Sequence, residues 1–493
     1  MSSTLHDSTP CLPSTDDKYT GIFNTTMTAI FYKADVETDQ APPSDLIIPI
    51  SRHGAANSVS LFVLPADNAT NTISLPRNIR RAVFSVSANG QATEEFWWSN
   101  VLQSDVATFN ATAGELPGLS PFREVQVLID GQLAGVQWPF PVIFTGGVVP
   151  SLHRPIVGIH AFDLREHEID ITPFLPLLCD GKQHTFTIRV AGLNDIGASS
   201  SSADLTESVN ESWYVTGKLF LWLDANPASI TTGSAPTINL SPPTILVTRA
   251  LTADTNGTNQ TLTYTTSVQR ALKITTADLR TQNSSSSSSS HPSPATWSQS
   301  LSYTNRGLVT DYGFTQINDL LIKGTDHSTL PSHHDQTPYT TTYAYPLFCN
   351  STYAVSTAGN LSISAFLRQG KEVSVSGPSV FPSGLEAFSQ GGKGKGKGLV
   401  RVLETSKEGT AEFRQTGDGK ASSGWGDARQ VFWFGVGDGV RGEKKGEELY
   451  FREVEAVNGT VVGDVKRLAG RTVEVDVPGL RVGAAAVGAT EYA

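Results

Sequence analysis

Residues 120–131 read S-P-F-R-E-V-Q-V-L-I-D-G, and this stretch shows the pattern that decides the fold. From Glu124 onward polar and apolar residues alternate, and the stretch ends in an Asp-Gly pair typical of a turn. The same pattern recurs in three other stretches: R-A-V-F-S-V-S at 81–87, H-T-F-T-I-R-V at 184–190 and K-L-F-L-W-L-D at 218–224. A helical periodicity does not persist for three turns outside 170–178, where proline interrupts it. The sequence therefore predicts an all-β fold of the jelly-roll sandwich kind.

The chain of 493 residues is too long for one ordinary core, and its length predicts two domains of about 200 residues each. We expect two jelly-roll-like antiparallel β-sandwich domains packed side by side. A polar stretch with prolines at 225–236 is the expected boundary. The predicted division is a disordered or truncated N-terminus at 1–18, a β-sandwich at 19–225, a linker at 226–240 and a second β-sandwich at 241–493 with low-complexity insertions near 283–296 and 391–398.

The composition argues against a nucleic-acid partner. Charged residues make up 17% of the chain and the net charge is −11. Its only basic run is K-G-K-G-K at 393–397. A nucleic-acid-binding protein needs a basic surface, and this chain does not supply one. An acidic exterior suits a secreted protein.

The signals for cellular compartment point in two directions. Eleven N-x-S/T sequons favour the secretory route: Asn24, Asn68, Asn110, Asn210, Asn239, Asn256, Asn259, Asn283, Asn350, Asn360 and Asn458. Residues 1–11 lack a basic region followed by an apolar one, and no run of about 18 apolar residues occurs. We expect a secreted or secretory-pathway protein whose signal or anchor is missing from this sequence, without stable membrane insertion, and the alternative is a cytosolic protein.

Cysteine and histidine give no sign of a metal site. Cys11, Cys179 and Cys349 form an odd set, so at most one intramolecular disulfide can form. The sequence holds no C-x-x-C motif, and His333 and His334 lie in polar, loop-like sequence. We therefore predict neither a metal nor a cofactor.

Acids and tryptophans gather between 93 and 170. The blocks are T-E-E-F-W-W-S-N-V at 93–101, W-P-F-P-V-I-F-T-G-G at 138–147 and A-F-D-L-R-E-H-E-I-D at 161–170. A sugar-handling hydrolase needs carboxyl groups to move protons and flat aromatic rings to stack on a pyranose. The alternative is a plain β-sandwich whose tryptophans are core and whose glutamates are solvated.

These blocks, together with F-L-P-L-L-C-D-G at 174–181 and V-T-G-K-L-F-L-W-L-D at 215–224, closely resemble the fungal and plant peptide-N-glycosidase A family. The resemblance runs from Tyr19 to about Asp224 and is thinner from Ser300 onward, where it rests on S-Y-T-N-R-G at 302–307 and Y-P-L-F at 345–348. Members of this family are amidases that remove N-glycans from asparagine. The resemblance implies the same activity on an N-glycosylated peptide or glycoprotein.

Hydrolysis of a glycosylated asparagine needs one carboxylate to activate water and a second acid or cation for the departing nitrogen or the oxyanion. It needs no metal. Glu94 and Glu95 are the first candidates, because they precede F-W-W-S-N-V, where the side chains of a strand alternate between two faces. We favour Glu95. A bacterial branch of peptide-N-glycosidases has an aspartate in a similar acid-aromatic-Asn-Val strand, but it is displaced by one position, so the choice between Glu94 and Glu95 stays open.

Further candidates come from neighbouring blocks. Arg123 and Glu124 are a possible acid and cation, and the alternative is a cross-strand ion pair on a solvated face. Asp195 falls near the place where the bacterial branch has a second functional carboxylate. Other candidate charges are Asp163, Arg165, Glu166, Glu168 and Asp170. The candidates for stacking on sugar are Trp97, Trp98 and Trp138, although core packing is the favoured explanation for each tryptophan.

Two positions depart from the family pattern. His153 and His160 stand where the resemblance implies Trp and Asp, which predicts an altered cleft or a weakened activity. We expect the site in a cleft between the two domains, facing 93–101. The competing hypotheses are a catalytically inactive glycan-binding β-sandwich and a glycoside hydrolase that cuts between the two GlcNAc units.

Overall fold

The protein is all-β in the computed structural model, as the sequence predicts. The structure describes residues 2–5, 27–30, 43–51, 59–156, 158, 160, 165–198, 201–282, 293–329, 339–377, 400–437, 447–468 and 471–473. Asp163, residues 283–292 and residues 391–398 of the predicted insertions, and most of 1–18, lie outside these ranges. The helices are short: α1 (Leu175–Leu178) and the 3-10 turns η1 (Ala92–Glu94), η2 (Trp97–Ser99), η3 (Gln103–Asp105), η5 (Thr172–Phe174) and η6 (Asp311–Gly313). None in the described part of the chain is long and apolar enough to cross a membrane.

Two five-stranded antiparallel sheets form an N-terminal sandwich. One has the order β11 (Asp204–Thr206), β10 (Gln183–Asn194), β7 (Glu124–Ile129) and β8 (Gln132–Gln137), with β5 (Thr70–Ser74) also on β10. The other has the order β3 (Leu46–Pro49), β12 (Trp213–Leu223), β6 (Ile79–Gly90) and β9 (His167–Asp170), with β4 (Phe62–Leu64) also on β12. The four stretches predicted as strands lie in β6, β7, β10 and β12, which confirms them.

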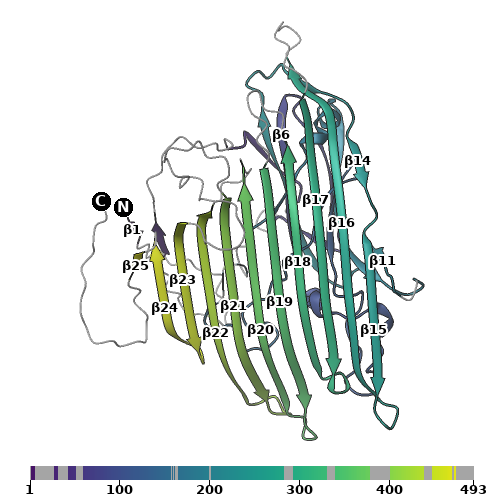
Figure 1. The fold of residues 1–493 in the computed structure, drawn as a ribbon, viewed down its shortest axis with the longest axis vertical. Coiled ribbons are helices and arrows are strands. Elements are labelled where there is room, and N and C mark those ends of the chain that lie inside the picture. Colours follow the sequence, from purple (N-terminus) through teal and green to yellow (C-terminus); the bar gives the residue numbers. More distant parts are fainter. Residues whose placement is uncertain are drawn as a thin grey trace.

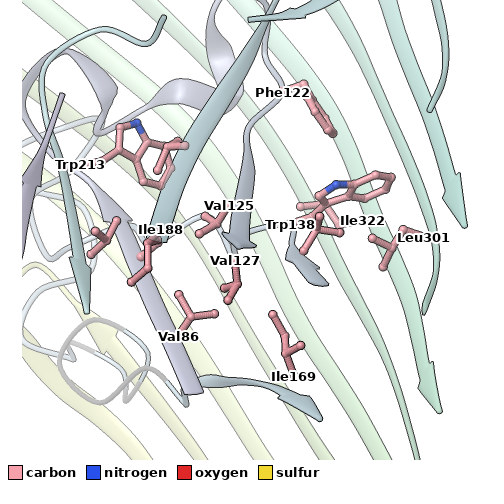
Figure 2. Packing of buried hydrophobic residues seen from close by; sticks show 14 of the residues in the cluster. Val86, Phe122, Val125, Val127, Trp138, Ile169, Ile188, Trp213, Leu301 and Ile322 are labelled. Atoms are coloured by element: carbon pink, nitrogen blue, oxygen red, sulfur yellow. The ribbon is translucent and has the colours of Figure 1, made fainter. Parts of the chain in front are cut away.

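The two sheets approach closely because small residues stand between large ones. The rings of Phe84 on β6 and Phe186 on β10 stack with centroids 6.3 Å apart. A Cβ added at Gly217 on β12 would lie 2.8 Å from the Phe84 ring and 2.9 Å from Ile188, so only glycine leaves room there. Figure 2 shows Val86, Val125, Val127 and Ile188 together in this interior.

The second half of the described chain forms one 13-stranded antiparallel sheet, the long sheet. From β16 to β25 each strand pairs with its neighbour in sequence, and β13, β14 and β15 all pair with β16. Its strands are β13 (Ile230–Thr232), β14 (Thr237–Leu240), β15 (Thr244–Ala253), β16 (Asn259–Gln282), β17 (Ser293–Thr310), β18 (Thr315–Thr329), β19 (Tyr339–Val355), β20 (Leu361–Ser376), β21 (Val400–Gln415), β22 (Ser422–Gly437), β23 (Glu447–Val457), β24 (Thr460–Leu468) and β25 (Arg471–Val473). The sequence predicted a sandwich for this half, and alternation alone does not say whether successive strands stay in one sheet or turn into a second.

The stretch predicted as a linker, 226–240, contains β13 and β14 and therefore contributes to the long sheet. The division into domains at this point stays a prediction. A separate pair, β1 (Ser2–Leu5) and β2 (Met27–Ile30), forms a two-stranded sheet.

The sandwich lies against one face of the long sheet, behind β16 to β18 in Figure 1. Phe122 and Trp138 from the sandwich share a core with Leu301 on β17 and Ile322 on β18 (Figure 2). Strands β8 and β9 are sheet edges that meet the long sheet: Gln299 on β17 bonds the backbone of Val136, and Ser328 on β18 donates to Asp170. The two halves therefore share one buried interface.

Candidate active site

The 93–101 region is a series of turns, whereas the sequence predicted a strand. Ala92 has a positive φ of 52°, which ends β6 and starts η1. The N–H groups of Ser99 and Asn100 then bond the carbonyls of Phe96 and Trp97 in 3-10 fashion. Because turns do not alternate between two faces, Trp97 and Trp98 are both buried, and neither ring is available to stack on a sugar in this conformation. Trp97 packs at 6.3 Å from Trp213.

Glu94 is buried in a fully bonded ion pair. Its carboxylate accepts two parallel bonds from Arg123, at 2.5 Å from Nε and 2.7 Å from Nη2. The indole of Trp213 and the backbone N–H of Asn210 complete the set, at 2.7 and 3.1 Å. Neither Glu94 nor Arg123 has any exposed surface. This pair ties η1, β12 and the segment before β7 together, and four protein donors surround the carboxylate.

Glu124 is also buried and paired, but on the opposite face of β7. Its oxygens accept bonds from Arg270 on β16 at 2.5 Å, from Gln126 at 2.8 Å and from the Trp138 indole at 3.0 Å. The solvated Arg123–Glu124 pair considered from sequence is therefore absent, because each residue pairs with another partner. The Trp138 ring is core as well and meets Phe122 edge to face at 5.3 Å.

Glu95 and Asp195 reach solvent, unlike Glu94 and Glu124. Glu95 is partly exposed, its carboxylate has no hydrogen-bond or ion-pair partner among the described residues, and partial burial raises its pKa. Asp195 accepts a bond of 3.0 Å from the Ser104 N–H. The structure thus brings Glu94 and Arg123 together, but it does not gather the sequence-derived candidates into one cleft, and their catalytic assignment stays a prediction.

A different set of residues lines a cleft between the sandwich and the long sheet. This cleft, the β9–β18 cleft, has about 560 Å³ of empty space, which includes the open solvent at its mouth. Its lining residues come from β9 and the segments before it on one side and from β18, β19 and β20 on the other: Gln137, Phe140, Arg165, Glu166, His167, Glu168, Asp326, Tyr339, Thr341, Tyr343, Tyr345, Lys371 and Val373. The cleft lies between the two halves, where the sequence predicted the site, but residues 93–101 do not line it, and the location of the site stays a prediction.

Two carboxyl groups in the cleft have strongly raised pKa values. Burial raises the pKa of Glu168 to about 7, although Arg165, whose Nη2 lies 3.3 Å away, opposes the shift. Burial raises the pKa of Asp326 to about 8, a bond from Gln299 opposes the shift, and the charge of Glu168 adds to it. Both side chains are more than nine-tenths buried. Neighbouring carboxyls that titrate near neutrality can act as a proton donor and a proton acceptor in the same reaction.

Aromatic rings form the wall beside these acids. Tyr343 and Tyr345 on β19 stack with centroids 5.1 Å apart, and Phe140 meets Tyr345 edge to face at 5.2 Å. His167 meets Tyr343 at 5.8 Å. Lys371 lies over Phe140 and Tyr345, at 5.3 and 5.9 Å from their centroids.

A smaller pocket of about 300 Å³ adjoins the cleft and shares Phe140 with it. His160 lies here, with Nε2 at 2.7 Å from the Thr405 hydroxyl. Burial and the charges of Lys371 and Lys407 lower the pKa of His160 to about 3, so this histidine is neutral at pH 7. His153 is fully buried, and burial and Lys407 lower its pKa to about 3 as well. With pKa values this low, neither histidine can act as a proton acceptor in place of the carboxylate that the family pattern implies.

Sequence reasoning named Glu168 only as a further charge and missed Asp326, Tyr343 and Tyr345. Asp326 stands in G-T-D-H at 324–327, where no neighbouring acid or aromatic marks it. The only available signal was Y-P-L-F at 345–348, which contains one wall residue. Among the described residues no group of three or more His, Cys, Asp and Glu side chains is arranged to hold a metal ion.

The raised pKa values predict that stability falls as pH rises. The ordinary values are 4.5 for Glu and 3.8 for Asp, so between these and about 7 to 8 the folded protein keeps protons that the unfolded chain releases. The free energy of unfolding should therefore decrease as pH rises through this window. The double variant Glu168→Gln, Asp326→Asn should be more stable than the wild-type protein at pH 8 by roughly a few kcal/mol. Urea unfolding at pH 5 and pH 8 measures this. Glu115→Gln, at an exposed position, is the control, and equal pH slopes in all three proteins would contradict the prediction.

Comparison with known proteins places the chain in a family. Residues 13–239 match the family described as "Peptide N-acetyl-beta-D-glucosaminyl asparaginase amidase A", and residues 263–347 match the "PNGase_A C-terminal domain". Both halves of one family's architecture thus follow one another in this chain. The chain belongs to the PNGase A family. The resemblance found in the sequence is thereby confirmed, and the cleft is assembled from both matched segments of PNGase A, with Glu168 in the first and Asp326 and Tyr343 in the second.

A curated relative is the peptide-N4-(N-acetyl-beta-glucosaminyl)asparagine amidase A of Prunus dulcis. It is 37% identical over 223 residues, which cover 42% of this chain and 36% of the Prunus protein. The match therefore spans about a third of the length of that PNGase A. No solved structure matches the chain.

Proposed function

We propose that the protein is an amidase that hydrolyses the bond between N-linked GlcNAc and the asparagine side chain, which releases the glycan and leaves aspartate. The family and the name of the Prunus relative support this activity. The observation that carries the proposal is the β9–β18 cleft, where Glu168 and Asp326, two buried carboxyls with pKa values near neutrality, lie beside tyrosine rings.

The cleft residues supply what the reaction needs. An ionised carboxylate takes a proton from water while the water oxygen bonds to the amide carbon. The second carboxyl, still protonated, gives its proton to the amide nitrogen as the C–N bond breaks and its electron pair moves to nitrogen. The products are the aspartate side chain and the glycosylamine. Burial favours one ionised and one protonated carboxyl, because two neighbouring negative charges in a low dielectric oppose each other.

The aromatic wall suits the sugar part of the substrate. A pyranose has an apolar face of C–H groups that packs on aromatic rings, and tyrosine adds a hydroxyl for hydrogen bonds. Tyr343 carries a buried hydroxyl that has no partner in the described residues. This hydroxyl lies against Gly324, so the half-buried ring of Tyr345 is the part of the wall that we propose to meet the sugar. A glycopeptide substrate fits the amidase family.

Mass spectrometry of a synthetic N-glycopeptide tests the proposal. In ¹⁸O-water the purified protein should convert the glycosylated asparagine to ¹⁸O-labelled aspartate, and EDTA should not prevent it. The double variant Glu168→Gln, Asp326→Asn is the matched control and should leave the peptide intact. A product that retains one GlcNAc would instead identify a glycosidase, and an unchanged peptide at every pH between 4 and 9 would overturn the proposal in favour of a glycan-binding protein.

A further inference from the structure

Gln299 links the free edge of the sandwich to one of the two cleft carboxyls. It stands on β17 and is almost fully buried. Its Oε1 accepts a bond of 2.9 Å from the Val136 N–H, and its Nε2 donates to the Val136 carbonyl at 2.9 Å. The same Nε2 donates to Asp326 Oδ1 at 2.8 Å. The Gln299 amide therefore makes three hydrogen bonds to two partners, Val136 and Asp326.

The backbone of Val136 fixes which way the amide points. A flipped amide would set Oε1 against the Val136 carbonyl and Asp326 Oδ1, two acceptors, and would face the Val136 N–H with an NH₂ group. All three hydrogen bonds would be lost. Gln299 therefore presents a donor to Asp326, and this assignment follows from the hydrogen-bond network.

A permanent donor at Oδ1 decides where the proton of Asp326 resides. In a protonated carboxyl the carbonyl oxygen is the better hydrogen-bond acceptor. Oδ1 accepts from Gln299, so it takes the place of the carbonyl oxygen and Oδ2 carries the hydrogen. We propose that Gln299 is a positioning residue that holds the proton of Asp326 on Oδ2, which makes Asp326 the acid for the departing nitrogen and Glu168 the base for water. This inference rests on the proposed amidase function.

The groups around Oδ2 are compatible with a proton there. His167 on β9 has its Nε2 3.3 Å from Oδ2, and this nitrogen makes no hydrogen bond. Burial, Arg165 and Lys371 lower the pKa of His167 to about 4, so the ring is neutral and leaves Asp326 without a charged partner at that oxygen. The other titratable groups that face Asp326 are Glu168 on β9, Arg165 before it, Tyr339, Tyr343 and Tyr345 on β19 and Lys371 on β20.

The assigned roles balance the reaction. Glu168 accepts one proton from water, and the oxygen of that water bonds to the side-chain carbon. Asp326 releases the Oδ2 hydrogen to the nitrogen, which leaves with the electron pair of the broken C–N bond. The pair ends with its proton on Glu168, and exchange with solvent returns the starting state.

The pH dependence of kcat for Gln299→Met tests the positioning role. Gln299 favours the ionised form of Asp326 and so lowers its pKa, and its loss should raise that pKa. The alkaline limb of the profile, where the acid loses its proton, should move upward by about one pH unit. The maximal kcat should fall by roughly tenfold, because the proton is no longer confined to one oxygen. A merely structural role would lower kcat and leave the limb in place.

Two further variants complete the experiment. Gln126→Met removes an amide donor from the buried Glu124 carboxylate outside the cleft, and its limb should stay at the wild-type position. Gln299→Asn is one methylene shorter, so its amide cannot span both Val136 and Asp326, and it should move the limb as Gln299→Met does even if the methionine variant does not fold. An unmoved limb in the folded Gln299 variants overturns the positioning role while wild-type turnover still stands. Absence of turnover in the wild-type protein overturns the proposed function itself.

Discussion

Glu168→Gln and Asp326→Asn are each expected to lower kcat by roughly two to four powers of ten, with glycopeptide affinity changed only a few-fold. Each substitution keeps the size and most hydrogen-bonding atoms of the side chain but removes its ability to accept or donate the proton. Steady-state kinetics on a defined N-glycopeptide, with binding of the intact peptide measured on the double variant, separates the loss of turnover from a loss of binding. The folded state of each variant is checked by its unfolding midpoint.

The turnover of Glu95→Gln decides between a catalytic base in the β9–β18 cleft and one in the 93–101 region. Glu95 is the candidate favoured by sequence, and its carboxylate reaches solvent with a raised pKa. If the catalytic base lies in the β9–β18 cleft, this variant keeps kcat within a few-fold of the wild-type value. A loss of turnover in Glu95→Gln together with normal turnover in Glu168→Gln would move the reaction to the 93–101 region.

Glu94→Gln is expected to destabilise the protein by about 3 to 5 kcal/mol, because it leaves the Arg123 guanidinium buried without its counter-charge. Arg123→Met should cost a similar amount for the converse reason. The double variant Glu94→Gln, Arg123→Met should recover part of the loss, since no buried charge then remains unpaired. Urea unfolding of the four proteins gives the coupling energy of the pair.

We expect the ion pair to act only on stability, so turnover per folded molecule should be unchanged in Glu94→Gln under conditions where the variant is folded. A catalytic Glu94 would show the opposite pattern, with normal stability and a large loss of kcat. The exposed pair Arg414–Glu412 serves as a control, because a surface ion pair contributes little and Glu412→Gln should change stability by less than about 1 kcal/mol.

The strands were predictable from sequence because alternation is a local property. The stretches at 81–87, 124–131, 184–190 and 218–224 lie in observed strands, apart from the turn residues 130–131 and Asp224 at their ends. The turns at 93–101 were not predictable from sequence, because F-W-W-S-N-V has the pattern of a strand. A positive φ at Ala92 and bonds to partners such as Asn210 fold this region into turns. Such partners are more than a hundred residues away in sequence.

The candidate site was harder to predict, because its two acids lie far apart in the chain. Glu168 belongs to the sandwich and Asp326 to the long sheet, and only the docking of β9 against β18 brings them together. Their raised pKa values come from that burial, which no local pattern encodes. Two other candidate acids from the sequence, Glu94 and Glu124, lie beside tryptophans, but as hydrogen-bond acceptors for the indoles of Trp213 and Trp138.

The division of the acid pair between the two halves has a consequence during synthesis. A ribosome finishes β9 well before it reaches β18, so a nascent chain carries Glu168 while Asp326 has not yet been made. Until β17 and β18 have left the exit tunnel and docked, such a chain holds only one half of the proton-transfer pair. Under the proposed function, a polypeptide that ends before β18 therefore lacks deglycosylating activity.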